Sequence, residues 1–509
     1  MAKLSLVVLA ASAAALLIPD QQPLNHPELQ MPIRRPSEDD DSKPFVNTEG
    51  LQDRIKIGSL WKRAEKLYEI AQKGEEEYGH PTRVIGSKGH LATIDYIRSE
   101  LAALGGYYNV SQQTFGAVSG SVREFRLTIG SHVPNTTTTM GLTPPTARKE
   151  PVFGDLILVD NVGCNKSDYP SAVKGNIAFV KRGECSFGVK SLLAGQAGAV
   201  AAVIYNTDPE EIHGTLGTPS KKQVATFGLG GKEGSEYAEL LSRGKVLSAS
   251  AYIDSTVNTI KTNNVIAQST SGDPNNCVML GGHSDSVAEG PGINDDGSGS
   301  LSVLEVAVQL ARYRIKNCVR FAWWSAEEEG LLGSDHYVAS LSGEENLKVR
   351  LFMDYDMMAS PNFAYQVYNA TDDSSPAGSQ ALRDLYINWY KDHGLNHTLV
   401  PFDGRSDYDG FIKGGIPAGG IATGAEGVKT KEEEAMFGGE AGKWYDENYH
   451  QIGDDLSNLN LTSWEVNTKL IAHSVATYAA SLEGFPKRSK QLGVQSSPQR
   501  KYHGKKLVM

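Results

Sequence analysis

Residues 277–328 read CVMLGGHSDSVAEGPGINDDGSGSLSVLEVAVQLARYRIKNCVRFAWWSAEE, and this stretch decides the fold. It begins with a short apolar strand at Cys277–Leu280, continues with an apolar helix at Ser300–Ile315, and reaches a second apolar strand at Val319–Trp324. Strands and helices that alternate in this way are typical of a mostly parallel sheet with helices on its faces. The stretch therefore predicts an α/β fold.

The alternation continues on both sides of this stretch. Toward the N-terminus, apolar residues between Leu51 and Leu104 recur at helical spacing, so we expect helices there. The residues Thr462-Ser463-Trp464-Glu465 have the pattern of a capping box, which predicts a last helix that begins at Thr462 and runs to about Leu482. The elements expected before that helix are a helix at Ser334–Leu341, a strand at Val349–Met353, a helix at Gln380–Asp392 and a strand at Ile416–Ile421.

A different pattern occupies residues 131–262, where short strands alternate with turns. We expect strands at Asp155–Val159, Asn176–Val180 and Val200–Tyr205, and a helix at Lys190–Ala199. Such a pattern indicates a small α/β domain with its own core, inserted into the larger domain.

The ends of the chain carry a different kind of signal. The 509 residues are too many for a single core, which agrees with two domains. Lys3 followed by the apolar run Leu4–Ile18 is typical of a signal peptide, so we expect a secreted, extracellular protein. The acidic, proline-rich segment behind it is either a propeptide or a solvated leader. The expected division is a signal peptide (1–19), a leader or propeptide (20–46), the first part of the main domain (47–130), the insert (131–262), the rest of the main domain (263–485) and a basic tail (486–509).

Charge and composition restrict the partners. The net charge is −11 and no basic stripe is present, so we expect no nucleic-acid partner. No stretch after the signal peptide is long enough to span a bilayer, so we expect no membrane association, and we expect a monomer. Six sequons behind a signal peptide predict a glycoprotein. Their acceptors are Asn109, Asn135, Asn165, Asn369, Asn396 and Asn460.

The four cysteines allow three pairings in an oxidising compartment. We favour Cys164 with Cys185, which lie within the insert, and Cys277 with Cys318, which begin two apolar strands. Free buried thiols remain the alternative.

Histidines and carboxylates gather between residues 283 and 450, each after an apolar strand or in a glycine-rich turn. Taken singly, each has an ordinary explanation, such as a turn, a helix cap or a solvated face. Together they supply a zinc pair, because zinc binds imidazole nitrogen and carboxylate oxygen and two ions share a bridging carboxylate. One further carboxylate must stay off the metals to accept a proton from the attacking water. The set predicts hydrolysis and consists of His283, Asp285, Asp295, Asp296, Glu327, Glu328, Asp356 and His450.

Four motifs in this region resemble those of the family 28 metallopeptidases: Gly282–Ser286, Gly292–Gly299, Trp323–Glu328 and Tyr449-His450. The resemblance runs from about residue 50 to residue 485. Within the family, the chain is most similar to the secreted fungal leucine aminopeptidases that carry a protease-associated domain. The segment Gly175–Phe187 resembles the pattern of that domain. The resemblance implies a zinc exopeptidase fold with a protease-associated domain inserted.

The resemblance also assigns roles within the adjacent pairs, which spacing alone does not separate. It implies two zinc ions per chain, with Asp295 as the bridge between them and Glu327 as the general base. It further implies a strained peptide bond, in the cis form, after Asp295. The other implied roles are His283 and Asp356 as ligands of one ion, Glu328 and His450 as ligands of the other, Asp285 as the residue that orients His283, Tyr449 as a hydrogen-bond donor to the oxyanion and Arg405 as a substrate-binding residue.

The implied reaction is hydrolysis of the N-terminal residue from peptides with a free amine, with leucine or another apolar residue preferred. A carboxypeptidase would need clustered basic residues to bind a free carboxylate, and the sequence offers only Arg405 near the motifs. A binding protein built on a peptidase scaffold is the alternative from another class, and the full ligand set argues against it. Two departures from the family pattern, Glu329 and Asp354, add negative charge. They could tighten metal binding or raise the pKa of the base, but we expect both simply to face solvent.

Overall fold

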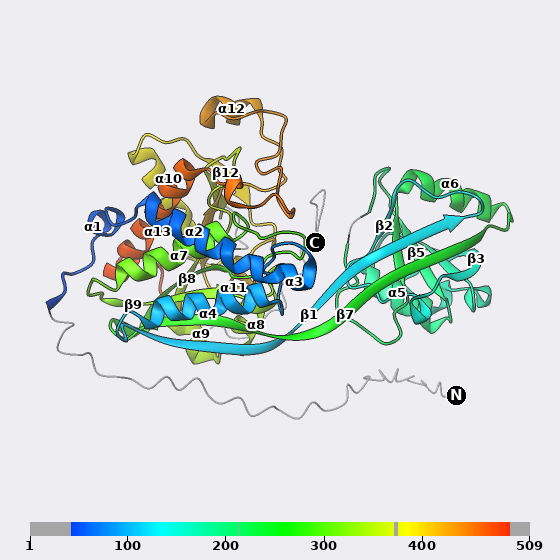
Figure 1. Cartoon of the computed structure of the whole chain (residues 1–509), viewed down its shortest axis with the longest axis horizontal. Coiled ribbons are helices and arrows are strands. Elements are labelled where there is room, and N and C mark those ends of the chain that lie inside the picture. The colour runs from blue at the N-terminus through cyan, green and yellow to red at the C-terminus, as the bar shows by residue number, and fades with distance from the viewer. Residues whose placement is uncertain (1–41, 213, 371–374, 489–509) are drawn as a thin grey trace, which may run out of the picture. The chain divides into compact units, whose positions relative to one another are not determined.

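The computed structural model of the chain describes residues 42–212, 214–370 and 375–488 (Figure 1). The expected signal peptide, residues 20–41 of the leader and residues 489–509 of the tail lie outside these ranges. Within the ranges, no helix has both the length and the apolar character that a membrane span requires.

Among the described residues, seven strands follow one another across the sheet of the main domain, in the order β12-β11-β13-β10-β8-β9-β7. The pairs β8–β9, β8–β10, β10–β13 and β11–β12 are parallel, whereas β11–β13 and β7–β9 are antiparallel. The mostly parallel α/β sheet expected from the sequence is therefore confirmed. The strands are β7 (Ser248–Ser269), β8 (Asp273–His283), β9 (Asn317–Trp324), β10 (Val349–Tyr355), β11 (Gln366–Asn369), β12 (Thr398–Pro401) and β13 (Ala418–Ala422).

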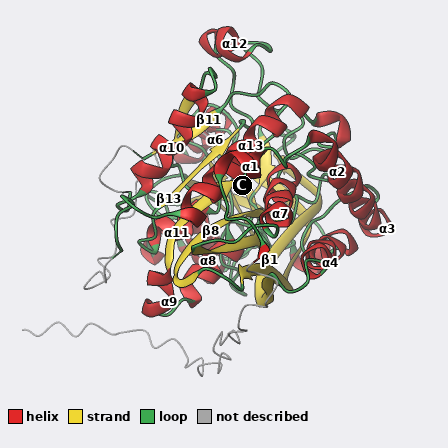
Figure 2. Cartoon of the chain, turned by 90° about the vertical axis from the view of Figure 1, so that its left-hand side faces the viewer, coloured by secondary structure: helices red, strands yellow, loops and turns green. Residues whose placement is uncertain are grey.

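Helices cover both faces of this sheet (Figure 2), because alternate side chains of a strand point to opposite faces. In β9, Phe321 and Trp323 join one apolar cluster, whereas Ala322 and Trp324 join another. The first cluster contains residues of α1 (Thr48–Gln52), α2 (Ile57–Ala71), α4 (Lys88–Ala102), α7 (Gly297–Leu310), α10 (Ser379–Asp392) and α13 (Leu461–Ala480). The second contains residues of α8 (Leu332–Ser340) and α11 (Tyr408–Lys413). The main domain also contains the short helices α3 (Glu75–Tyr78), α9 (Gly343–Lys348) and α12 (Lys431–Phe437).

The insert has a sheet and a core of its own. The pairs β3–β4, β4–β5 and β5–β6 are parallel, and β2 pairs antiparallel with β6. Ile177 and Phe179 of β4 join one apolar cluster, and Ala178 and Val180 join another on the opposite face. The insert is therefore the small α/β domain that the sequence predicts. Its elements are β2 (Thr137–Thr139), β3 (Val152–Leu158), β4 (Ile177–Lys181), α5 (Phe187–Gln196), β5 (Ala201–Tyr205), β6 (Thr226–Leu229) and α6 (Gly231–Ser242).

Two strands of 22 residues each, β1 (Tyr108–Ile129) and β7, run antiparallel along their length and form a ribbon (Figure 1). β7 also pairs with β9 of the main domain and with β3 of the insert. The boundaries expected at residues 130 and 262 thus fall at the end of β1 and inside β7. The sequence does not predict this ribbon, because its middle is largely polar or exposed and lacks the apolar alternation of a half-buried strand.

Both disulfides favoured by the sequence are formed, Cys164–Cys185 in the insert and Cys277–Cys318 in the main sheet. The second follows from strand register, because Val278 of β8 pairs with Val319 of β9 and the cysteines precede these two residues. The described residues include no free cysteine.

The six acceptor asparagines differ in their surroundings. Asn135, Asn165 and Asn396 are exposed and therefore offer the more accessible amides. Asn109, Asn369 and Asn460 are half-buried. The threonine of one sequon, Thr371, lies outside the described residues.

The last helix, α13, begins at Leu461, and its N-cap is Asn460 rather than Thr462. The side chain of Asn460 accepts a hydrogen bond from the Ser463 amide at 3.1 Å. Glu465 forms an ion pair with Lys469 one turn along the helix. The predicted capping box is therefore wrong, because asparagine is a better cap than threonine and lies two residues earlier.

Replacing Asn460 with alanine should lower the free energy of unfolding by about 1 kcal/mol, because the first turn of α13 loses its side-chain cap. The matched variant Asn460→Asp also removes the sequon but keeps an oxygen acceptor, so its melting temperature should stay close to that of the parent. Thermal melting of both variants measures the difference. Equal stability of Asn460→Ala and Asn460→Asp would show that Asn460 is not the cap.

Candidate metal centre

The central parallel strands bring the predicted site residues to one edge of the sheet. His283 is the last residue of β8, Glu327 and Glu328 follow β9, and Asp356 follows β10. Because β8 is parallel to both β9 and β10, the carboxyl ends of all three lie at the same edge, which is where ligands bind in open α/β sheets.

At this edge two imidazoles face the two oxygens of one carboxylate. Asp295 lies just before α7, with Oδ1 3.1 Å from Nε2 of His283 and Oδ2 3.2 Å from Nε2 of His450. Each imidazole has a second carboxylate beside it. Oδ1 of Asp356 is 3.7 Å from Nε2 of His283, and Oε2 of Glu328 is 3.0 Å from Nε2 of His450. The result is two half-sites, each with one histidine and one acid, joined by Asp295; we call them together the metal centre.

The donor atoms of the metal centre fit two zinc ions. Oδ1 of Asp356 and Oε1 of Glu328 are buried and accept no hydrogen bond from any described residue. Buried carboxylate oxygens without donors are costly unless a cation binds them. Zinc takes imidazole nitrogens and carboxylate oxygens, and a metal pair requires a shared carboxylate. One ion would be held by His283 and Asp356, the other by Glu328 and His450, with Asp295 between them.

The electrostatics also favour positive charge at the metal centre. Burial would lower the pKa of His283, but the nearby carboxylates, above all Glu327 and then Asp295, raise it well above its ordinary value. Burial would raise the pKa of Asp295, yet hydrogen bonds from His283 and His450 bring it below its ordinary value. The imidazoles therefore attract protons, and dications would neutralise the same carboxylates more fully.

Asp296 also lies close enough to His283 and Asp356 to share an ion with them, but both of its oxygens already accept hydrogen bonds from the backbone. Its Oδ2 accepts the His283 amide at 3.0 Å, and its Oδ1 accepts the amides of Gly299 at 2.9 Å and Met357 at 3.0 Å. Asp296 is thereby the N-cap of α7, and it fixes the end of β8 to the start of that helix. The peptide bond between Asp295 and Asp296 is cis, as the resemblance implies.

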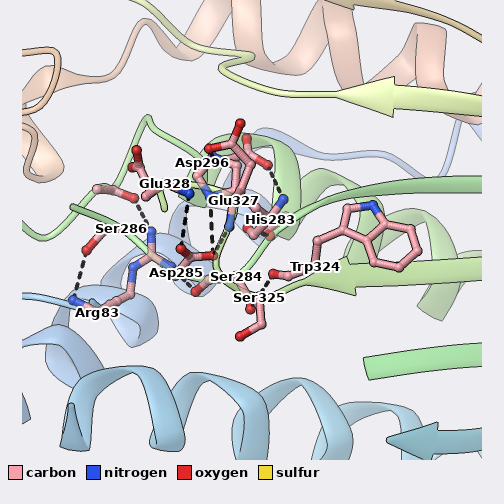
Figure 3. A network of polar contacts seen from close by, with 12 residues as sticks. Arg83, His283, Ser284, Asp285, Ser286, Asp296, Trp324, Ser325, Glu327 and Glu328 are labelled. Atoms are coloured by element: carbon pink, nitrogen blue, oxygen red, sulfur yellow. Dashed lines mark hydrogen bonds and ion pairs between the residues drawn. The ribbon is translucent and has the colours of Figure 1, made fainter. Parts of the chain in front are cut away.

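Asp285 lies beneath the turn that carries both glutamates (Figure 3). Its two oxygens accept the main-chain N–H groups of Glu327 and Glu328, each at 3.4 Å, and its Oδ1 is 3.8 Å from Nδ1 of His283. Burial raises the pKa of Asp285 to about 6. The carboxylate therefore holds the glutamate turn, and it lies beside Nδ1 of His283 without a hydrogen bond to it.

Glu327 and Glu328 reach different parts of the metal centre. Glu328 contacts His450, whereas Oε2 of Glu327 is 3.9 Å from Nε2 of His283. Burial raises the pKa of Glu327 well above its ordinary value, and the charge of His283 only partly offsets this. A carboxylate with a high proton affinity beside the half-sites has the character of a general base.

The structure places Tyr449 and Arg405 near each other but gives them different surroundings. The Tyr449 ring stacks on the imidazole of His450, with 3.8 Å between ring centroids. The Arg405 guanidinium forms a two-point ion pair with Glu426, with Nη1 2.8 Å from Oε1 and Nη2 3.0 Å from Oε2. The charge of Arg405 is therefore largely neutralised within the protein.

Asp354 does not face solvent and Glu329 does so only in part, so that expectation is wrong for Asp354 and only partly right for Glu329. Asp354 is fully buried, its Oδ2 accepts the Tyr408 amide at 3.1 Å, and burial raises its pKa to about 7. Oε2 of Glu329 is also buried, and burial raises the pKa of Glu329 well above its ordinary value. Asp354 is inside because its strand, β10, lies in the middle of a sheet that is covered on both faces.

The sequence analysis missed a layer of polar residues beneath the metal centre. Arg83 precedes α4, His90 lies in its first turn, and Asp454 follows His450 along the chain. The two oxygens of Asp454 accept the main-chain N–H groups of Asp295, at 3.0 Å, and of the residue before it, at 2.8 Å. Arg83 stands directly before two apolar residues, a pattern from which its burial could have been suspected. No spacing marks His90 or Asp454.

Comparison with known families and proteins gives matches over most of the chain. A model described as Peptidase family M28 matches residues 264–475, and a model of the PA domain matches residues 152–237. Aminopeptidase Y of Saccharomyces cerevisiae is 50% identical over 485 residues, which cover 92% of this chain and 88% of that protein. Leucine aminopeptidase 2 of Trichophyton equinum is 44% identical over 466 residues, which cover 88% of this chain and 89% of that protein.

Solved structures give the same result for the fold. An aminopeptidase from Aneurinibacillus sp. strain AM-1 matches with a TM-score of 0.69 at 26% identity, and the match covers 85% of this chain and 96% of that one. BSAP, a zinc aminopeptidase from Bacillus subtilis, matches with a TM-score of 0.57 at 21% identity and covers 84% of this chain and 96% of its own. At that identity, the second match supports the fold alone.

Proposed function

The chain belongs to peptidase family M28 and is a metallo-aminopeptidase, and from this premise we propose that it uses two zinc ions to remove leucine and other apolar residues from the N-termini of peptides. The observation that carries the two-ion proposal is the carboxylate of Asp295, whose oxygens lie 3.1 and 3.2 Å from the imidazoles of two different half-sites. A single ion would need only one of these half-sites.

The proposed mechanism gives each nearby side chain a separate task. When bound, the zinc ions would polarise the scissile carbonyl and lower the pKa of the attacking water. Glu327 takes a proton from that water and later delivers it to the nitrogen of the leaving amine. Tyr449 donates its hydroxyl hydrogen bond to the oxyanion, with its ring held against His450. Asp285 holds the glutamate turn in place throughout, and it lies beside the imidazole of His283.

The charge balance of the site supports an aminopeptidase over a carboxypeptidase. A free carboxylate on the substrate would need an unpaired cation, and Arg405 is already bound at two points by Glu426. A free α-amine needs no such cation, so the pairing of Arg405 with Glu426 favours a substrate that is recognised at its N-terminus. The proposed role of Arg405 is therefore to shape the substrate pocket together with Glu426 rather than to bind a substrate carboxylate.

A leucyl chromogenic amide should be hydrolysed, whereas its N-acetylated form should not, because the acetyl group removes the charge of the amine. A leucyl peptide blocked at its C-terminus should be cleaved as readily as the free peptide. Chelation should abolish the activity and zinc should restore it, with metal analysis giving two ions per chain. Cleavage of the N-acetylated amide, or a requirement for a free C-terminus, would exclude the proposed reaction.

The setting of the reaction is proposed from the ends and surface of the chain. The charged and apolar start at Lys3–Ile18 supports secretion, and exposed acceptors such as Asn135, Asn165 and Asn396 support a glycoprotein. Both disulfides agree with an oxidising compartment. We propose that the leader is a propeptide and that the enzyme acts as a monomer outside the cell.

A further inference from the structure

Arg83 is a fully buried cation that ties together two loops of the metal centre (Figure 3). Its guanidinium donates hydrogen bonds to main-chain carbonyls of the loop that follows His283 and of the loop that leads to Asp295. One side chain therefore spans the two segments that carry a histidine ligand and the shared carboxylate. The three bonds run from Nη1 to Ser284 O (2.5 Å), from Nη2 to Gly292 O (2.5 Å) and from Nε to Pro291 O (2.8 Å).

The same segment of chain makes further contacts with these loops. The Arg83 amide donates to Oγ of Ser286 at 2.9 Å. At the other end of the segment, Nε2 of His90 lies 3.0 Å from Oγ of Ser284 and 3.2 Å from Oγ of Ser325, which begins the turn that carries the two glutamates. We call residues 82–90 the brace. It contacts all three loops that supply ligands at the ends of β8 and β9 and at the start of α7.

Gly292 has the backbone conformation and the absence of a side chain that the approach of the guanidinium requires. Its φ is +61°, and a Cβ at this position would meet the Arg83 guanidinium and the Asp295 carbonyl. Only glycine therefore allows the close approach of this loop to Arg83.

The charge of Arg83 also has partners. Burial lowers the pKa of Arg83, and the carboxylates that oppose this shift most are Asp285 and Asp296, followed by Asp454 and Asp295. The guanidinium is thus a buried positive charge among the acids that surround the metal centre.

We propose that Arg83 is a positioning residue for the half-site of His283 and Asp356, holding the His283 loop and the Asp295 loop at the separation that lets both contribute to one ion. The inference rests on the proposed two-ion function and adds a residue to it. A planar guanidinium suits this task because its donors are fixed in a fork, whereas a lysine ammonium is a point charge on a flexible stem. Both His283 and Asp295 lie on loops that Arg83 holds. The other half-site, of Glu328 and His450, shares only Asp295 with these loops, so Arg83 should affect it less.

Arg83→Lys in the full chain tests the proposal, because it keeps the charge and removes the fork. The measurement is equilibrium dialysis of the metal-free protein against buffered Zn²⁺, repeated with Co²⁺ to follow the absorption of each loaded site. We expect the parent to bind two ions, and the variant to bind one ion normally and the other about 10- to 100-fold more weakly. The matched control is Arg488→Lys, because the Arg488 guanidinium also donates to main-chain carbonyls, those of Val349 at 2.7 Å and Gly415 at 3.1 Å.

The melting temperatures of the metal-free proteins separate positioning from simple destabilisation. Normal binding of both ions by Arg83→Lys, together with a fall in melting temperature like that of Arg488→Lys, would overturn the proposal. Ser286→Ala is the milder second variant if Arg83→Lys does not fold, and it should weaken the same ion to a smaller extent. A parent protein that binds two ions but leaves the leucyl amide intact would contradict the proposed function, and the comparison of Arg83→Lys with its control would still decide the role of Arg83.

Discussion

Glu327→Gln should retain both zinc ions and lose about 10²- to 10⁴-fold in kcat, because glutamine keeps the size of the side chain but cannot take the proton of the attacking water. Glu327 is suited to this role by position and environment. Its carboxylate lies 3.9 Å from His283, outside the shorter contacts of the two half-sites, and burial raises its pKa. Steady-state kinetics on a leucyl amide and metal analysis of the same sample measure the two properties together.

The matched control for this substitution is Glu329→Gln, which alters a half-buried acid two residues along the same turn. Glu329 has no task in the proposed mechanism, so its variant should stay within about tenfold of the parent. Wild-type turnover by Glu327→Gln would mean that another carboxylate is the base. Loss of zinc from Glu327→Gln would instead make Glu327 a ligand.

Asp295→Ala should lose both ions and at least about 10⁵-fold in activity, because it removes the one carboxylate that contacts both histidines. Truncating any other ligand of the metal centre leaves one half-site intact and should leave one ion bound. Metal analysis after dialysis distinguishes these outcomes directly, without relying on the loss of activity.

Asp254→Ala is the control for general destabilisation. Asp254 is a buried acid on the β1–β7 ribbon, where it pairs with Arg123 and with Lys149. Its removal should lower the melting temperature and leave both ions in place. Tight binding of two ions by Asp295→Ala would refute the role of Asp295 as the bridge.

The sequence predicts the central sheet well because the strongest local pattern coincides with the deepest burial. The strand expected at Val319–Trp324 is observed at Asn317–Trp324, where every residue is buried. An apolar run of this length between two helical patterns is rarely anything other than a buried strand. The β1–β7 ribbon is missed because it forms by pairing between residues far apart in the sequence and not from a local pattern. The separations run from 120 positions, for Ile129 with Ala249, to 161 positions, for Tyr108 with Ser269.

Within the metal centre, local spacing predicts which residue types come together. It does not predict which carboxylate faces the histidines and which accepts hydrogen bonds from the backbone. Asp295 and Asp296 are adjacent, and only the fold shows that the second is occupied by three main-chain N–H groups. Arg83 is about 200 positions from the loops that it joins, so no motif around His283 includes it. Asp354 is mispredicted because a charged residue is normally exposed. Its burial depends on parts of the chain that are distant in sequence and cover its strand, and no local pattern reveals them.

The ribbon of β1 and β7 has a consequence for how this chain architecture can arise. Ile129 lies opposite Ala249, so the backbone leaves the ribbon and returns to it at neighbouring positions after more than a hundred residues. In topological terms the whole insert occupies the place of a hairpin turn. Chain length added at such a point costs little closure entropy, because that cost grows only with the logarithm of the loop length. An ancestral enzyme with a short hairpin at the edge of its sheet could therefore acquire a complete second domain without altering the register of any catalytic strand.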